Sequence, residues 1–320
     1  TIIDGEGIRN CMELGSLGDD SLIKGFTLTD CYREFSGINY NYAGGAGIYL
    51  YNSSFPIIED MKILNAKLQL WEGSNGNDNG GAGIMAHYEY NSNNSLTLNR
   101  VVVDGSRVVR EGNSCTDGGN LRGAGVYING YGGITINLND VVISNNKFEL
   151  YGSGSECELD DMGDTHGGGL YIDYVSDINI DTISLYGNEA SSGAAFITDS
   201  SNRLNIDNAD IMNNLGESYV MYLPSPYVNI KNSSIKNNSS RTQIVSIHGT
   251  ELLIENSEIV GNYYSNVENI LDCETVDSNF HILYLSLSSE VIITNVLIAD
   301  NFQCGSANIH FNGTDEIYFV

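Results

Sequence analysis

Three residues suited to acid–base chemistry occupy the same place in a repeated glycine-rich pattern. Asp173, Asp199 and His87 each lie three residues beyond the last residue of a tetrapeptide of the type Gly-Ala-Gly-apolar. If the tetrapeptides stack in space, Asp173 and Asp199 approach to roughly 5 Å, near the carboxyl separation of retaining glycosidases. The two could then act as an acid and a nucleophile or base, with His87 assisting. Chance alignment or a shared cation explains the pair as well, since the chain is rich in acidic residues.

Tyrosines recur beside these positions. Tyr49, Tyr127 and Tyr171 directly follow three of the tetrapeptides, and Tyr51 and Asn129 occupy the position that holds an aspartate elsewhere. Aromatic rings cover the C–H surfaces of sugars, while amides and carboxylates bind hydroxyl groups. These five residues therefore form our candidate glycan-binding surface. The alternative is that tyrosine is frequent here only because it packs well in exposed strands.

The sequence lacks a complete set of residues for polysaccharide chemistry. A uronate lyase needs a base and a positive group near the developing anion, but no Lys or Arg occupies the two positions just described. Arg107, Arg110 and Arg122 lie nearest, and surface ion pairs explain them more simply. The Asn-x-Asp, Asp-Asp, Gly-His-Gly and Arg-x-Lys motifs of polygalacturonase-like hydrolases do not occur together. Whether the chain is an enzyme stays open here, and the sequence favours a noncatalytic protein.

An acidic insertion that precedes the tetrapeptide at residues 167–170 could bind calcium. Its carboxylates include Glu156, Glu158, Asp160, Asp161 and Asp164. Calcium prefers such oxygen ligands, although the spacing is not that of an EF-hand. A solvated loop tied down by Cys157 is the alternative. No other cofactor is expected.

A repeated strand-and-turn unit must position all of these residues. Units of the form apolar-x-apolar-x-Asn/Asp/Gly-Asn recur in segments such as GFTLTDC (25–31), RVVVDGS (100–106), VVISNNK (141–147) and SEIVGNY (257–263). Superposing them matches Val102 with Ile143 and places one corner at Asp30, Asn65, Asp104, Asn145, Gly187, Asn213, Asn237, Gly261 and Asp300. The next position collects Asn146, Asn188, Asn214, Asn238, Asn262 and Asn301. Asn, Asp and Gly tolerate the left-handed backbone of a sharp bend, so the pattern predicts a solenoid.

The spacing of the units identifies the kind of solenoid. In the second half they recur at about 24 to 26 residues, which suits three short strands and three bends per coil. The tetrapeptides begin a second strand in each coil, whose inward residues are Ile48, Ile84, Val126, Leu170 and Phe196. A third strand opens each coil in segments such as FPIIED, SLTLNR and ITINLND. The sequence therefore predicts an all-β parallel β-helix of about nine to ten coils, with long loop insertions in several coils, as one continuous domain over residues 1–320.

The opening segments TIIDGEG and SLIKGFTLTDC resemble the first coils of secreted right-handed parallel β-helix repeat proteins. The GGAG strand and the I-x-x-N-N units are similar to cell-surface β-helices of the adhesin or polymorphic-membrane-protein type. The resemblance covers nearly the whole chain and implies a single right-handed solenoid. It does not identify a function, because that superfamily contains lyases, hydrolases, epimerases, tailspikes and noncatalytic surface proteins.

The six cysteines form three pairs, and the two members of each pair fall in consecutive coils. This register favours the pairs Cys11–Cys31, Cys115–Cys157 and Cys273–Cys304, with free thiols as the alternative. Disulfides would indicate an extracellular or cell-surface location. If the source is a eukaryote, the sequons at Asn52, Asn93 and Asn312 are the glycosylation candidates.

The charge of the chain restricts its partners. With 41 Asp and Glu residues against 14 Lys and Arg, the net charge is −27. Such a surface repels phosphate backbones and anionic headgroups, so we expect no nucleic acid partner and no direct membrane insertion. Glycans or other surface proteins are the partners that we expect.

The chain begins and ends inside repeats, with TIIDG and EIYFV. We expect a fragment or processed part of a longer protein, with head-to-tail self-association of the terminal coils into a filament as the alternative. Two functional hypotheses follow. One is a noncatalytic structural or adhesive β-helix that contacts glycans, and the other is a polysaccharide-degrading enzyme, a glycoside hydrolase or lyase, that acts along the same face.

Overall fold

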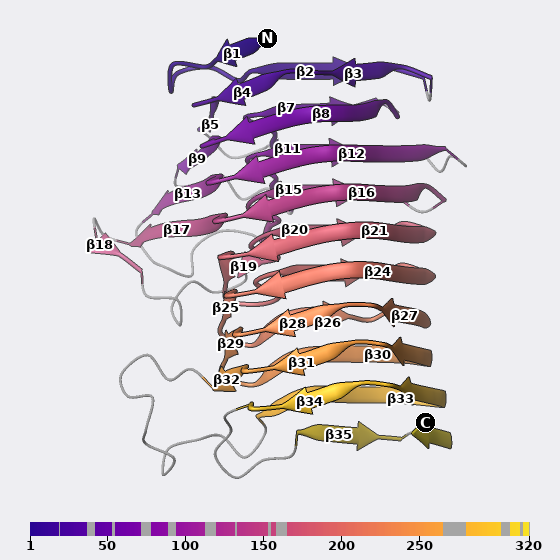
Figure 1. Cartoon of the computed structure of the whole chain (residues 1–320). Helices are drawn as coiled ribbons and strands as arrows, with labels where there is room; N and C mark the ends of the chain where they lie inside the picture. The colour runs from indigo at the N-terminus through magenta and orange to yellow at the C-terminus, as the bar shows by residue number, and fades with distance from the viewer. Residues whose placement is uncertain are drawn as a thin grey trace.

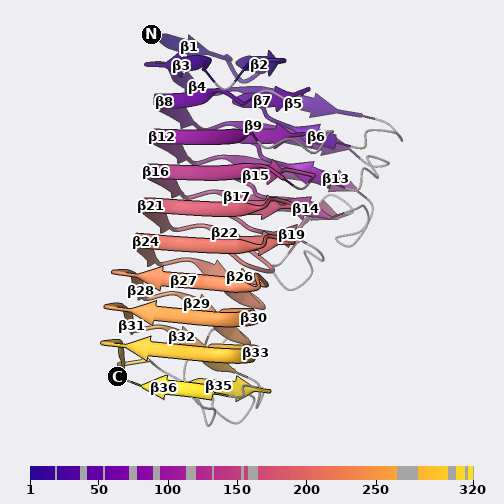
Figure 2. The same cartoon turned by 90° about the vertical axis from the view of Figure 1, so that its right-hand side faces the viewer.

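The computed structural model describes residues 1–18, 20–36, 42–52, 55–71, 78–88, 94–112, 120–131, 133–152, 155–157, 165–264, 280–301, 308–313 and 316–319. Every regular element in these ranges is a β-strand, from β1 (Ile2–Asp4) to β36 (Glu316–Phe319). The strands stack along a single axis, with β1 at one end and β36 at the other (Figures 1 and 2). The predicted all-β parallel β-helix is confirmed.

Two runs of strands make up the largest sheet, which has 23 strands. The first run contains the strands that follow the Gly-rich bends, and its members pair in parallel from coil to coil. It consists of β2 (Met12–Gly15), β7 (Ile48–Tyr51), β11 (Ile84–His87), β15 (Val126–Asn129), β20 (Leu170–Asp173), β23 (Phe196–Asp199), β26 (Tyr219–Leu223), β30 (Gln243–Glu255), β33 (His281–Thr294) and β35 (Ile309–Asn312).

The second run joins two predicted strands of the coil into one. Its long members are β8 (Ile57–Leu64), β12 (Ser95–Asp104), β16 (Thr135–Ser144), β21 (Asp177–Tyr186) and β24 (Arg203–Met212). Each is bent at one residue with positive φ, such as Asp60, Asp140 or Asn208. A single left-handed residue turns the chain while the residues on both sides keep their pairing, so the expected separate strands merge.

A nine-stranded sheet forms the remaining side of the coils. Along its path lie β5 (Tyr32–Phe35), β9 (Lys67–Trp71), β13 (Arg107–Gly112), β17 (Lys147–Gly152), β22 (Glu189–Ala190), β25 (Leu215–Gly216), β29 (Ser239–Ser240) and β32 (Tyr263–Tyr264). In the first coils a four-stranded sheet of β6 (Tyr42–Gly44), β10 (Asp78–Gly80), β14 (Leu121–Arg122) and β19 (Thr165–His166) accompanies it. The two sheets enclose a small second core that contains Leu68, Val108, Leu121 and Phe148.

The main core is a column of stacked aliphatic side chains. The predicted inward residues Ile48, Ile84, Val126, Leu170 and Phe196 are all buried, and they pair with one another in register. Each coil therefore covers the apolar residues of its neighbours, as expected for a solenoid in which no coil could bury its own core.

The predicted left-handed corner is present with one correction. Asp30, Asn65, Asn145, Gly187, Asn213, Asn237, Gly261 and Asp300 have φ between +49° and +67°. In the third of these coils the left-handed residue is Gly105, with φ of 68°, and not Asp104. Val103 pairs with Ile143, so the predicted match of Val102 with Ile143 was wrong by one residue. The shift keeps Val103 in the core and gives the strained backbone position to glycine, which adopts it at least cost.

The residues that directly follow this corner form a buried amide ladder. It consists of Asn146, Asn188, Asn214, Asn238, Asn262 and Asn301, the set collected from the sequence. The first five are at most 1% exposed. Asn188 illustrates the pattern: its Oδ1 accepts hydrogen bonds from the backbone N–H and the Nδ2 of Asn146 at 3.1 and 3.0 Å. Its Nδ2 donates to the Ile143 carbonyl and to Asn214 Oδ1, each at 3.0 Å.

We expect that interrupting the amide ladder lowers the stability of the protein strongly. Asn214→Ala removes a donor to the Leu185 carbonyl and an acceptor for the backbone N–H of Asn188. Because these partners are buried, we expect the free energy of unfolding to fall by about 2 to 4 kcal/mol in denaturant titrations. Asn205→Ala is the matched control from the same coil, since its amide donates to Asn179 Oδ1 on the half-exposed outer side. It should cost less than about 1 kcal/mol, and equal losses in the two variants would contradict the role of the ladder.

Candidate functional site

The outward residues of the first run form one row that crosses the coils. In pairing order they are Glu13, Tyr49, Met85, Tyr127, Tyr171, Ile197, Tyr222, Ser246, Tyr284 and His310. A parallel row contains His87, Asn129, Asp173 and Asp199. The register predicted for Tyr49 through Asp199 therefore holds.

The expected exposure of this row is wrong in the first coils. Tyr127 is 0% exposed, Asn129 1% and Tyr171 4%. Tyr127 and Tyr171 pack with Met85 and Ile197 in a small cluster outside the main core. These three glycan-binding candidates therefore do not present an open surface.

The burial follows from the Gly-rich bends. Gly45, Gly81, Gly123 and Gly167 have φ between +55° and +67°, and the chain turns sharply there. The strands just before the bends, β6, β10, β14 and β19, consequently lie close to the outward row. A methyl group built on Gly44 would lie 2.1 Å from Met85 Sδ, which shows how closely the two segments approach.

Two arginine side chains also cover tyrosines of the outward row. The Arg122 guanidinium carbon lies 5.0 Å from the centre of the Tyr171 ring, and the Arg33 guanidinium carbon lies 4.6 Å from that of Tyr49. Tyr49 and Tyr51 remain half-buried, with ring centres 5.4 Å apart in a stacked arrangement. Of the five glycan-binding candidates, only these two tyrosines keep part of their surface exposed.

The proposed catalytic aspartates are neighbours, but one is buried. Asp173 pairs in register with Asp199. Arg122 Nη1 donates to Asp173 Oδ2 at 2.8 Å, and the Asp173 side chain is 1% exposed. Arg122 thus forms a buried ion pair, which corrects the expectation of a surface pair. The arrangement is not the open carboxyl pair that an enzyme would use on a long polymer.

His87 is also buried, at 4% exposure. Burial lowers its pKa from 6.5 to about 4, because the charged imidazolium would lose its hydration. The ring is therefore neutral at pH 7, and the expected assistance to an exposed carboxyl pair has no support in this position.

The buried ion pair predicts a recoverable loss of stability. Arg122→Met leaves the Asp173 carboxylate without this partner, and we expect the free energy of unfolding to fall by about 3 to 5 kcal/mol. The double variant Arg122→Met with Asp173→Asn removes the charge as well, so denaturant titration should show much of the loss restored. A double variant no more stable than Arg122→Met would contradict this assignment.

His87 predicts a pH dependence with a defined sign. Its pKa is lower in the folded state, so between about pH 6.5 and pH 4 the unfolded chain binds the additional proton. Its contribution to stability is complete above pH 6.5 and is lost as the pH falls toward 4, by an amount on the order of 2 kcal/mol. The stability difference between the parent protein and His87→Gln should shrink over that range. A constant difference would show that His87 is not buried in its neutral form.

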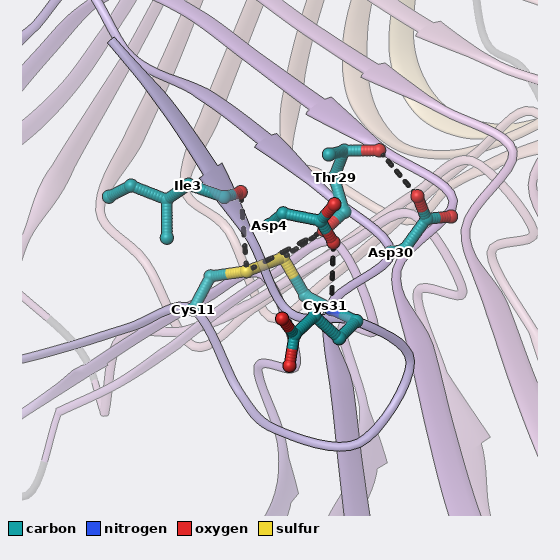
Figure 3. The surroundings of a disulfide bond; sticks show 7 residues. Ile3, Asp4, Cys11, Thr29, Asp30 and Cys31 are labelled. Carbon is teal, nitrogen blue, oxygen red and sulfur yellow. Dashed lines mark hydrogen bonds between the residues drawn. A yellow bond between two sulfur atoms is a disulfide. The ribbon is translucent and has the colours of Figure 1, made fainter.

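The disulfide predicted between Cys11 and Cys31 is present, with a Cα–Cα distance of 5.5 Å (Figure 3). Cys31 is fully buried and directly precedes β5, as Asn146 directly precedes β17. The covalent bond thus lies at a position equivalent to that of the amide ladder. Cys157 is also disulfide-bonded, but Cys115, its predicted partner, lies outside the described residues, as do Cys273 and Cys304.

Most of the predicted calcium loop also lies outside the described residues. Glu156 belongs to the short strand β18 (Ser155–Glu156), which pairs antiparallel with β17. Glu158, Asp160, Asp161 and Asp164 are not described. No group of three or more His, Cys, Asp or Glu side chains elsewhere in the described ranges is arranged to hold a metal ion.

Two of the three sequons can be placed. Asn52 is exposed at the coil corner after β7, with φ of 52°. Asn312 is exposed at the end of β35, and its Nδ2 donates to the Tyr284 hydroxyl at 3.0 Å. Asn93 lies outside the described residues. The amide of Asn312 is therefore already engaged on the outer face of the sheet.

The C-terminal half of the outward face carries a continuous series of rings. We call Tyr219, Tyr222, His248, Tyr284, His281 and His310 the aromatic ladder; they lie on β26, β30, β33 and β35. Ring centres are 5.1 Å apart for Tyr219–Tyr222, 5.3 Å for Tyr222–His248 and 5.6 Å for His248–Tyr284. Tyr284 and His310 stack almost parallel, at 5.1 Å and 6°, and His281 lies 4.5 Å from His310. All of these residues except the buried His281 are partly exposed.

In the described part of the chain, the strands that cover the first coils have no counterpart over this half of the face. The four-stranded sheet ends at β19, and no described strand continues it into the coils of β26 to β35. Only two residues separate β25 from β26, which leaves no room for a covering strand there. The same outward row is therefore buried in the first coils and partly exposed in the last ones.

Burial favours the neutral form of three of these rings. Burial raises the pKa values of Tyr219 and Tyr222, and burial lowers the pKa of His248 below 6.5. His248 also shares a hydrogen bond of 3.0 Å between its Nε2 and the Ser246 hydroxyl. Uncharged rings whose positions are fixed by contacts with their neighbours are suited to contact with the C–H surface of a sugar.

The sequence contained the signal for this ladder. The strings VMYL, VSIH, LYLS and IHFN continue the register that places Tyr49, Tyr127 and Tyr171. The Gly-rich tetrapeptides stop at Phe196, so the pattern that they define does not reach these strings. Continuing the inward and outward alternation would have located Tyr222, Tyr284 and His310.

No protein-family model, curated protein or solved structure matches this chain. No helix long and apolar enough to cross a membrane occurs in the described part of the chain. The fold and the face described above define a parallel β-helix protein with a partly exposed aromatic ladder.

Proposed function

We propose that this protein is a noncatalytic β-helix of adhesive or structural type that binds an extended glycan along the aromatic ladder. The observation that carries the proposal is the unbroken series of ring contacts from Tyr219 to His310 on a partly exposed sheet face. Coils repeat at about 4.8 Å, so successive rings can contact successive sugars of one chain.

The chemistry of the surrounding groups supports a glycan ligand. The rings provide flat apolar surface, while the Asn312 amide and the tyrosine hydroxyls provide donors and acceptors for sugar hydroxyls. The rings are already held against one another, so little side-chain freedom is lost on binding. The strand backbone beneath the ladder is rigid, which suits recognition of an extended polymer.

An extracellular or cell-surface location forms part of the proposal. The Cys11–Cys31 disulfide and the disulfide-bonded Cys157 support it, because such bonds persist in oxidising compartments. The net charge of −27 favours solubility and works against nucleic acid partners. The adhesin-type resemblance of the GGAG and I-x-x-N-N units points in the same direction.

Titration calorimetry with neutral and uronate-containing oligosaccharides of six or more residues tests this function. The parent protein should bind at least one of them, and Tyr284→Ala should weaken binding by at least about tenfold, because Tyr284 contacts His248, His281 and His310. Tyr227→Ala is the matched control. Tyr227 is 44% exposed on β27 (Tyr227–Lys231), in the second run of strands and away from the aromatic ladder. The Tyr227→Ala variant should bind the oligosaccharide with the affinity of the parent protein.

Two results would contradict the proposal. Unchanged affinity in Tyr284→Ala and Tyr222→Ala would show that the ladder is not the binding surface. New reducing ends or unsaturated products, lost in Asp199→Asn, would support a polysaccharide-degrading enzyme in place of a noncatalytic protein.

A further inference from the structure

A separate pocket of about 520 Å³ lies at a coil corner in the middle of the chain. Its lining residues lie at or just after the ends of β15, β20 and β23. These are neighbouring strands of the first run (Figure 1). The described residues that line it include Asn129, Tyr131, Tyr174, Ser176, Ser200 and Asn202. None of them belongs to the aromatic ladder.

Two exposed tyrosines dominate this pocket. Tyr131 and Tyr174 are 49% and 50% exposed, their ring centres are 6.3 Å apart, and the ring planes are tilted by 30°. The edge-on ring of His87 lies 5.7 Å from the Tyr131 ring. The two rings are therefore neighbours, both are partly exposed to solvent, and the His87 ring packs edge-on against Tyr131.

Both tyrosines have a backbone conformation that their side chains disfavour. Tyr131 and Tyr174 each have φ of 51°, in the left-handed region where Gly and Asn are common and bulky residues are rare. Other corners of this coil stack satisfy the same need with small polar residues, such as Asn52 and Ser200. Packing does not explain large exposed rings at strained positions, whereas strain of this kind gathers at ligand-binding sites.

The described residues that line the pocket carry no formal charge, although the protein as a whole is strongly acidic. Its described lining includes the amides of Asn129 and Asn202, the hydroxyls of Ser176 and Ser200, and the two phenol rings. The Ser200 hydroxyl donates to Asp199 Oδ1 at 3.3 Å. Asn129 is oriented by a 3.1 Å hydrogen bond to the Tyr127 hydroxyl. Apolar rings beside neutral donors and acceptors match a pyranose better than an ion, a phosphate or a uronate.

We infer that this corner pocket binds one neutral pyranose residue, stacked on Tyr131 and Tyr174. The site is independent of the aromatic ladder, because it lies in different coils and uses different residues. It also gives a role to Asn129, which is buried beneath the face but lines the pocket.

Saturation-transfer NMR and calorimetry with a panel of neutral methyl glycosides test this site. The parent protein should bind at least one member of the panel. Tyr131→Asn and Tyr174→Asn should each weaken that binding by about tenfold or more, while the melting temperature stays equal to or above that of the parent, since Asn tolerates a left-handed backbone. A merely structural tyrosine would not separate binding from stability in this way.

Matched controls separate this site from the ladder. Tyr186→Ala removes a tyrosine that is 37% exposed at the end of β21, and Tyr284→Ala interrupts the ladder; both should keep the affinity for the methyl glycoside. Absence of binding to every glycoside in the panel, or affinity within about twofold of the parent in both asparagine variants, would overturn the inference. Loss of glycoside binding in Tyr284→Ala alone would assign the sugar to the ladder.

Discussion

The buried amide ladder is the constraint on which the rest of the structure depends. From Asn146 to Asn262, each asparagine binds the coil before it and the coil after it, and its amide also donates to a backbone carbonyl of the preceding coil. The bonds are shielded from water, so a slip of one residue would leave buried polar groups unsatisfied in each coil that the ladder spans. This cost fixes the register of the corners. The aliphatic column of Ile, Leu and Val then stabilises the coils by burying apolar surface, without itself determining the register.

A fixed inner register also determines the outer face. Because side chains alternate along each strand, holding Val126 and Leu170 inward places Tyr127 and Tyr171 outward. What happens to the outward row then depends on the preceding segment of the chain. In the first coils strands β6, β10, β14 and β19 and the Arg122 side chain cover it; beyond β26 no described strand does so, and the aromatic ladder stays partly exposed.

The sequence is sufficient to predict structural features that repeat from coil to coil, and it is insufficient to predict those that occur only once. Asn146 to Asn301 and the inward residues Ile48 to Phe196 were found because each position recurs in several coils. Asp104 was misplaced because the segment VVVDG fits the pattern in two registers, and only packing of Val103 decides between them. The burial of Tyr127, Tyr171 and Asp173 could not be predicted, because it depends on how a nonrepeating insertion returns to the sheet. The strain at Tyr131 and Tyr174 likewise depends on φ values that no pattern specifies.

Residue-resolved hydrogen exchange tests the central role of the amide ladder most directly. The backbone N–H groups of Asn146, Asn188, Asn214 and Asn238 donate to side-chain oxygens at 2.9 to 3.1 Å rather than to a strand partner. If the ladder fixes the coil register, these corner amides should exchange as slowly as the core strand amides of Ile143 and Ile211, through global unfolding only. Exchange at the rate of exposed turn amides, while the strand amides stay protected, would show that the aliphatic column alone holds the coils in register.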